Sequence, residues 1–256
     1  GNVFMVSLLN AFPETFTVTA RPEDFQATVD RTQDQLQNRT ASLDVQGTRN
    51  GERLDITVEI AVQTGHKFPT SFPSRRAWLH MQVIDSKGAV VFESGTWQPD
   101  GSIVGNDNDL NPEQYEPHYV QITLPEQVQI YETIIGSPTG AVTTHLLSAK
   151  TYLKDNRLLP AGFDKTSAGR DIAVYGRAAE DADFTAGGDR VAYQIDLAGQ
   201  QGPFQVTAEL LYQTIGYRWA ENLRADGSPE SEEFFQVYDQ VENPPVLITR
   251  ASFTIK

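Results

Sequence analysis

The stretch Arg53-Leu54-Asp55-Ile56-Thr57-Val58-Glu59-Ile60-Ala61-Val62 sets the fold class of this chain. Every second residue in it is aliphatic: Leu54, Ile56, Val58, Ile60 and Val62. A period of two predicts a β-strand with one buried and one solvent-facing side. The Asn50-Gly51 pair just before it predicts a two-residue hairpin turn, because both central residues of a type I′ turn need positive φ. A partner strand is therefore expected from Ala41 onward.

Further short segments with strand character follow, and turn signals separate them. They cover residues 77–84, 89–93, 118–124, 127–135, 143–153, 191–197, 204–212 and 246–255. No βαβ alternation accompanies them. The sequence therefore predicts a mostly β fold, an antiparallel β-sandwich of the immunoglobulin or fibronectin kind.

Two segments have helical character. Pro22 begins the first, with acidic residues in the first turn and apolar residues at helical spacing, and we expect a helix over 22–38. A late helical insertion is expected between Ser228 and Val241 for the same reasons. Residues 1–10 are apolar but too few to fold alone, so they should dock on the rest of the chain. We expect a helical lead-in over 1–40 and a sandwich domain over 41–256.

Composition limits the classes of function. A chain of 256 residues, 39% of them hydrophobic, can bury a sizeable core. The formal net charge of −14 disfavours nucleic acids and anionic lipids as partners. No apolar run is long enough to span a bilayer. The chain opens at Gly1 without a methionine or a secretory signal, so we expect a mature or trimmed product.

Cysteine is absent from the sequence. This excludes disulfides, thiolate zinc sites, cysteine nucleophiles and covalent haem attachment through a C-x-x-C-H motif. No catalytic motif is present, and carboxylate-based hydrolysis has no supporting group of residues, so we do not expect an enzyme. Of the four histidines, His80 and His145 lie in predicted strands and are expected to have structural roles.

His66 has a different context. It lies in the loop Thr64-Gly65-His66-Lys67-Phe68-Pro69-Thr70-Ser71-Phe72-Pro73-Ser74-Arg75-Arg76, which follows a strongly predicted strand and contains two prolines. A stiff loop that presents one imidazole suits metal ligation, because little conformational freedom is lost on binding. The alternative is that the ring only bonds the backbone of its own loop.

A second loop, 100–109, is rich in side-chain oxygens. Its candidate cation ligands are Asp100, Asn106, Asp107 and Asp109. Calcium takes six to eight oxygen ligands, which such a cluster could provide. The spacing is not that of an EF-hand, and the alternative is a set of turns in which these side chains bond their own backbone.

Several runs together are more specific than any one alone. They are Gln35-Leu36-Gln37-Asn38-Arg39-Thr40-Ala41, Thr64-Gly65-His66-Lys67-Phe68-Pro69-Thr70, Pro73-Ser74-Arg75-Arg76, Trp78-Leu79-His80 and Glu116-Pro117-His118-Tyr119. In this order they resemble the C-terminal β region of bacterial multihaem c-type cytochromes, and the likeness covers most of the chain.

The resemblance implies an accessory β domain in extracytoplasmic electron transfer, in the periplasm or on the outer surface. It implies that residues 1–40 lead in from an upstream haem domain, and that the partner is a multihaem cytochrome domain or subunit. It also implies His66 as a distal haem ligand, with His118 as a second candidate. Haem c would belong to the partner, since this chain cannot attach it. The alternative is a stand-alone, calcium-stabilised immunoglobulin-like binding or adhesion module.

Overall fold

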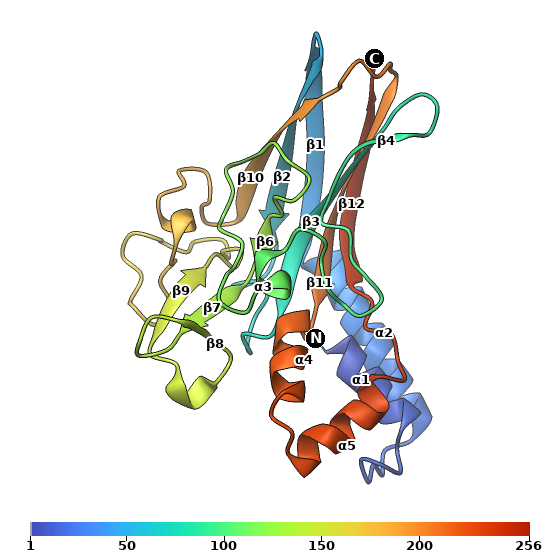
Figure 1. Cartoon of the computed structure of the whole chain (residues 1–256), viewed down its shortest axis with the longest axis vertical. Coiled ribbons are helices and arrows are strands. Elements are labelled where there is room, and N and C mark those ends of the chain that lie inside the picture. Colours follow the sequence, from blue (N-terminus) through green and yellow to red (C-terminus); the bar gives the residue numbers. More distant parts are fainter. Residues whose placement is uncertain (1) are drawn as a thin grey trace.

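The computed structural model describes residues 2–256. β1 (Ala41–Asn50) and β2 (Arg53–Val62) form a hairpin in it (Figure 1). All five aliphatic residues predicted to face the core are buried. The turn differs from the prediction. Asn50 pairs with Arg53, so the two loop residues are Gly51 and Glu52. Of these only Gly51, at φ 65°, has positive φ, which is the pattern of a type II′ turn rather than type I′.

Two sheets enclose the main core. The first has the order β1-β2-β10-β5, with β10 at Gly188–Asp196 and β5 at Gln121–Ile122. The second has the order β12-β11-β3-β4, with strands at Val246–Ile255, Phe204–Gln213, Arg76–Ile84 and Val90–Ser94, and β6 (Ile130–Tyr131) also pairs with β3. One buried cluster joins residues of both sheets. The edge strands of the two sheets, β1 and β12, lie side by side (Figure 1). Because the two sheets face each other across one core, the predicted mostly β sandwich is confirmed.

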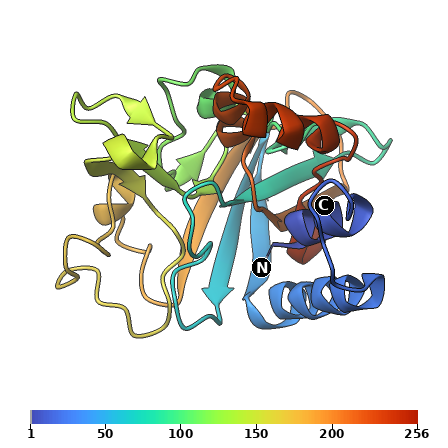
Figure 2. The ribbon, with the colours of Figure 1, turned by 90° about the horizontal axis from the view of Figure 1, so that it is seen from below.

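A small third sheet of β8 (Val142–Thr143), β7 (Thr133–Gly136) and β9 (Thr151–Asp155) lies beside the sandwich, on the side away from the N-terminal helices (Figure 2). Three predicted strands were wrong in extent. The one over 143–153 is interrupted by a short helix, Leu146–Ser148, whose Leu147 is fully exposed. The one over 127–135 divides into β6 and β7, which belong to different sheets, and the one over 118–124 shrinks to β5.

The N-terminal segment forms two helices. α1 (Val3–Ala11) packs on α2 (Pro22–Arg39), and α2 contacts β12 and β1 at the sandwich edge. The helix predicted over 22–38 is confirmed as α2, which ends one residue later, at Arg39. Asn2 explains where α1 begins, because its side chain accepts a hydrogen bond from the Met5 amide at 2.9 Å. The division at residue 40 stays a prediction.

The late helix predicted between Ser228 and Val241 is confirmed as α5 (Pro229–Tyr238). A further helix that was not predicted, α4 (Tyr217–Arg224), precedes it. α3 (Asp107–Leu110) and a second short helix at Arg177–Ala179 complete the elements. Within residues 2–256, no helix combines the length and the apolar character needed to cross a membrane.

Candidate functional site

His66 lies at the surface, in the loop between β2 and β3. Its Nδ1 is 3.1 Å from the backbone oxygen of Lys67. A carbonyl oxygen can only accept a hydrogen bond, so the ring carries its proton on Nδ1 and keeps a lone pair on Nε2. Nε2 makes no hydrogen bond with the described part of the chain. This is the tautomer that a metal-ligating histidine adopts when a backbone carbonyl orients it.

The residues after His66 anchor the loop to the rest of the domain. The Nζ atom of Lys67 is buried, 2.9 Å from Asp155 Oδ2 and 3.0 Å from the oxygen of Ala173. Burial lowers the pKa of Lys67, and the carboxylate of Asp155 opposes that shift. Phe68 and Leu158 exchange two backbone hydrogen bonds, of 2.9 and 2.8 Å. The loop is therefore fixed on both sides of the peptide that orients the imidazole.

His66 borders a pocket of about 230 Å³ at one end of the sandwich. Gln35 and Arg39 of α2 form one wall, and Arg75 comes from the far end of the loop. Tyr212 lines this pocket and also a neighbouring one that contains Val3 of α1. The imidazole thus lies at the end of the sandwich that carries the N-terminal helices, and two guanidinium groups accompany it.

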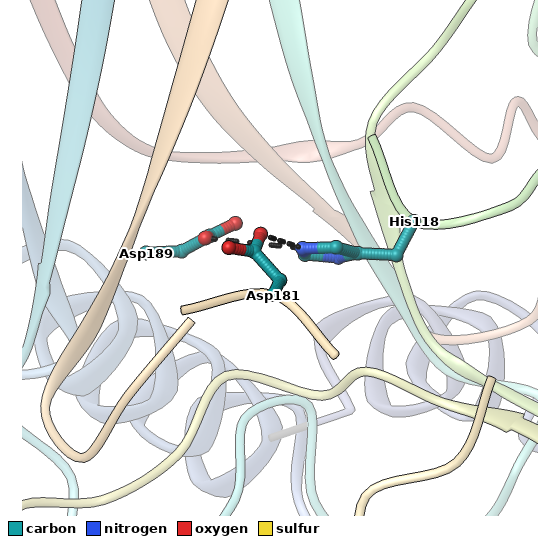
Figure 3. A group of neighbouring side chains, drawn as sticks. All are labelled: His118, Asp181 and Asp189. Carbon is teal, nitrogen blue, oxygen red and sulfur yellow. Dashed lines mark hydrogen bonds and ion pairs between the residues drawn. The ribbon is translucent and has the colours of Figure 1, made fainter. Parts of the chain in front are cut away.

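His118 is placed in the opposite way, inside the domain (Figure 3). Its Nε2 lies 2.9 Å from Asp181 Oδ2 and 3.9 Å from Asp189 Oδ1. Its Nδ1 lies 2.8 Å from Gln129 Nε2 and 3.1 Å from Asn156 Nδ2. Two amide groups therefore donate to Nδ1.

Backbone groups fix the orientation of both amides. The Oε1 atom of Gln129 accepts from the Tyr119 amide at 2.8 Å. Asn156 accepts from the Glu132 amide and donates to the oxygen of Ile130, at 3.0 and 2.8 Å. Neither amide can be reversed without losing these bonds. Nδ1 of His118 is therefore an acceptor, and the ring proton resides on Nε2, which donates to Asp181.

This arrangement corrects the expectation that His118 could be a haem ligand. His118 is 3% exposed, and both nitrogens of its ring are hydrogen-bonded within the chain. Among residues 2–256, one cluster has three side chains close enough to hold a metal ion together: His118, Asp181 and Asp189. A cation on Nε2 would move the proton to Nδ1, which faces only N–H donors. The three side chains thus form a buried polar network rather than a metal centre.

Burial sets the charges in this network. Desolvation lowers the pKa of His118 to about 4 and raises the pKa of Asp189 to about 7, with the charges of Asp181 and Asp183 adding to the second shift. Tyr131 donates to Asp189 Oδ2 at 2.5 Å. The sequence singled out His118 but neither carboxylate, because nothing local distinguishes a buried aspartate from the many exposed ones.

The four candidate calcium ligands do not converge. Asp100 is exposed and accepts from the amide and hydroxyl of Ser102. Asn106 caps α3, and the amide of Asp107 donates to Glu116. Asp109 is buried, with its carboxylate 2.9 and 3.0 Å from Nη1 of Arg76. These are turn, cap and ion-pair roles, so the structure does not assemble the expected calcium site.

The two remaining histidines differ in exposure. His80 lies on the second sheet between Glu209 and Glu93, at 2.9 and 3.0 Å. Burial opposes its charge, but the hydrogen bonds to these carboxylates outweigh burial and raise the pKa of His80. His145 is exposed next to the short helix Leu146–Ser148.

We predict that Asp109→Ala lowers the free energy of unfolding by about 3–5 kcal/mol, because it leaves the buried Arg76 guanidinium without its carboxylate partner. Asp100→Ala, at an exposed turn, should cost about 1 kcal/mol or less. Urea denaturation measures both. A chelator should leave the melting temperature of the parent protein unchanged, and a chelator-dependent drop would restore the calcium site.

A second prediction concerns pH. An aspartate whose pKa is raised in the folded protein contributes stability at low pH that is lost as the pH rises through the folded pKa. As the pH rises from about 4 to about 7, the parent protein should therefore lose stability that Asp189→Asn keeps. The variant should gain on the order of 4 kcal/mol in free energy of unfolding relative to the parent over this range.

The matched control is Asp164→Asn. Hydrogen bonds from Ser167 and Thr166 lower the pKa of Asp164 to about 2, so its difference curve should be flat over the same pH range. Denaturant melts at several pH values give both curves. A flat curve for Asp189→Asn would show that this carboxyl group is not held protonated by burial.

No family model matches this chain, and no curated protein matches it. Among solved structures it is similar to a penta-heme cytochrome c552 from Thermochromatium tepidum, with 15% sequence identity and a TM-score of 0.49. The similarity covers 87% of this chain and 41% of that one. The chain thus spans less than half the length of the structure it matches.

Proposed function

We propose that this chain is an accessory β domain of an exported multihaem cytochrome c assembly. In it the domain supports a haem-bearing partner and supplies His66 as a distal ligand to one of the partner's haems. The resemblance of the 64–76 loop and of the runs around it motivates this proposal. The assembly lies in the periplasm or on the outer surface, and the domain catalyses no reaction by itself.

The observation that carries the proposal is the state of the His66 ring. It is exposed, its Nδ1–H is held by the Lys67 oxygen, and its Nε2 has no partner among the described residues. An iron ligand needs a neutral imidazole with one lone pair facing outward. His118, by contrast, uses both nitrogens inside the domain.

The other residues present fit a haem that belongs to a partner. With no cysteine, the chain forms no thioether bonds to a haem of its own. Arg39 and Arg75 line the same pocket as His66, and guanidinium groups bind carboxylates such as haem propionates well. A haem bound at this face would supply one-electron transfer, while the protein residues orient and shield it.

The test uses a ferric c-type haem peptide whose distal axial position is open. Titrated with the domain, it should take up imidazole and change to a low-spin absorption spectrum. His66→Ala should weaken this binding by at least about tenfold, the effect expected from loss of one metal ligand.

His145→Ala is the control, because His145 is also exposed and its loss leaves the 64–76 loop intact. It should bind the haem peptide as the parent protein does. Equal loss in the two variants, or no spectral change with the parent domain, would contradict the ligand proposal. Circular dichroism and thermal melts of each variant exclude unfolding as the cause.

A further inference from the structure

A second cleft, of about 530 Å³, lies between the small sheet β8-β7-β9 and the segment that follows β9. Figure 2 shows this sheet on the side of the sandwich away from α1 and α2. The cleft is lined by Ser71, Pro73, Thr133, Ile135, Leu146, Ala149, Lys150, Thr151, Tyr152, Arg157, Arg170, Asp171 and Tyr175. Its volume is in the range of small-molecule sites. No local sequence pattern indicates it.

Positive charge gathers at this cleft in a strongly acidic protein. Its lining includes the cations Lys150, Arg157 and Arg170 against a single acid, Asp171, although the chain carries a formal net charge of −14. Lys150 and Arg170 form no ion pair with any residue in the described range 2–256. Both side chains are exposed, so their charges are available to an anion in the cleft.

The side chains around Asp155 add to this excess of positive charge. Arg157 makes two hydrogen bonds to the carboxylate of Asp155, of 2.9 and 2.8 Å. Lys67 bonds the same carboxylate, so two cations share one buried anion. An anion in the cleft would offset this surplus where solvent screening is weak.

One residue that lines the cleft has an unsatisfied hydroxyl. Thr133 of β7 lines the cleft and is 4% exposed. Its Oγ1 is buried and has no hydrogen-bond partner. Buried hydroxyl groups in folded proteins almost always have partners, and a ligand in the cleft would give Thr133 one.

Aromatic and aliphatic side chains form the remaining walls. The rings of Tyr152 and Tyr175 lie 5.3 Å apart at 43°. Backbone bonds to Asp155 fix Tyr175, and its hydroxyl donates to the Arg170 oxygen at 2.5 Å. Ile135, Leu146 and Pro73 add apolar surface. These walls suit a flat apolar body.

We propose that this cleft binds a small organic anion that joins a carboxylate to a planar apolar body. Lys150 and Arg170 bind the carboxylate, the hydroxyl of Thr133 donates to it, and the two tyrosine rings pack against the body. The cleft shares no lining residue with the pocket of His66, although Ser71 and Pro73 come from the same loop. The proposal does not depend on the haem proposal.

The test is calorimetric titration with 2-naphthoate as the probe. Two further titrations separate its parts: 2-naphthalenemethanol has the body without the charge, and inorganic phosphate has charge without the body. Naphthoate should bind at least about tenfold more tightly than either. Equal binding of the neutral compound, or of phosphate, would overturn the proposal.

Variants identify the site. Lys150→Ala and Arg170→Ala should each weaken naphthoate binding about tenfold, as expected for loss of one charge-assisted contact. Lys87→Ala removes the same charge from the exposed turn between β3 and β4 and should leave binding unchanged. An equal effect of all three variants would mean that general charge, not this cleft, holds the probe.

Thr133→Val adds a readout that a structural role would not give. In the free protein it removes a hydroxyl that has no partner, so the melting temperature should not fall. Naphthoate binding should nevertheless weaken, because the hydroxyl bonds the ligand. A fall in melting temperature with unchanged affinity would contradict the role assigned to this residue.

Discussion

The interaction on which the two sites depend is the buried ion pair between Lys67 and Asp155. It connects the loop after β2 with the end of β9, and the Phe68–Leu158 backbone pairing lies beside it. The carbonyl of Lys67 holds the His66 ring, so the anchored residue is also the one that orients the imidazole. On the other side, Asp155 holds Arg157 against the cleft. A buried pair that lost one partner would be strongly destabilised, which makes this connection costly to break.

His66 and His118 show how local partners determine the role of a side chain. A carbonyl beside His66 places the proton on Nδ1 and leaves a lone pair facing solvent. Two amides beside His118 place the proton on Nε2, where Asp181 accepts it. The same kind of side chain therefore keeps an outward lone pair at the surface and forms internal hydrogen bonds in the core. The two histidines differ in exposure, and their tautomers explain which ring nitrogen of each can accept a bond.

The spacing of apolar residues along the chain predicted the individual strands and helices whose burial it sets. Alternation in β2 and the helical spacing of α2 were sufficient, whereas the hairpin turn was placed one residue early because strand register sets it. The sites depend on distant residues. His118 and Asp181 are 63 positions apart, and Lys67 and Asp155 are 88 apart. No spacing rule connects such pairs, so the loop of His66 could be predicted from the sequence and the cleft could not.

Amide hydrogen exchange at Phe68 and Leu158 tests most directly whether the loop is held rigidly. Each amide donates to the other residue's carbonyl, at 2.9 and 2.8 Å. If the anchor holds, both amides should exchange only through the opening that also frees core residues such as Val58, with similar protection. Exchange at the rate of an unstructured peptide, while Val58 stays protected, would show a mobile loop and contradict the account of both sites.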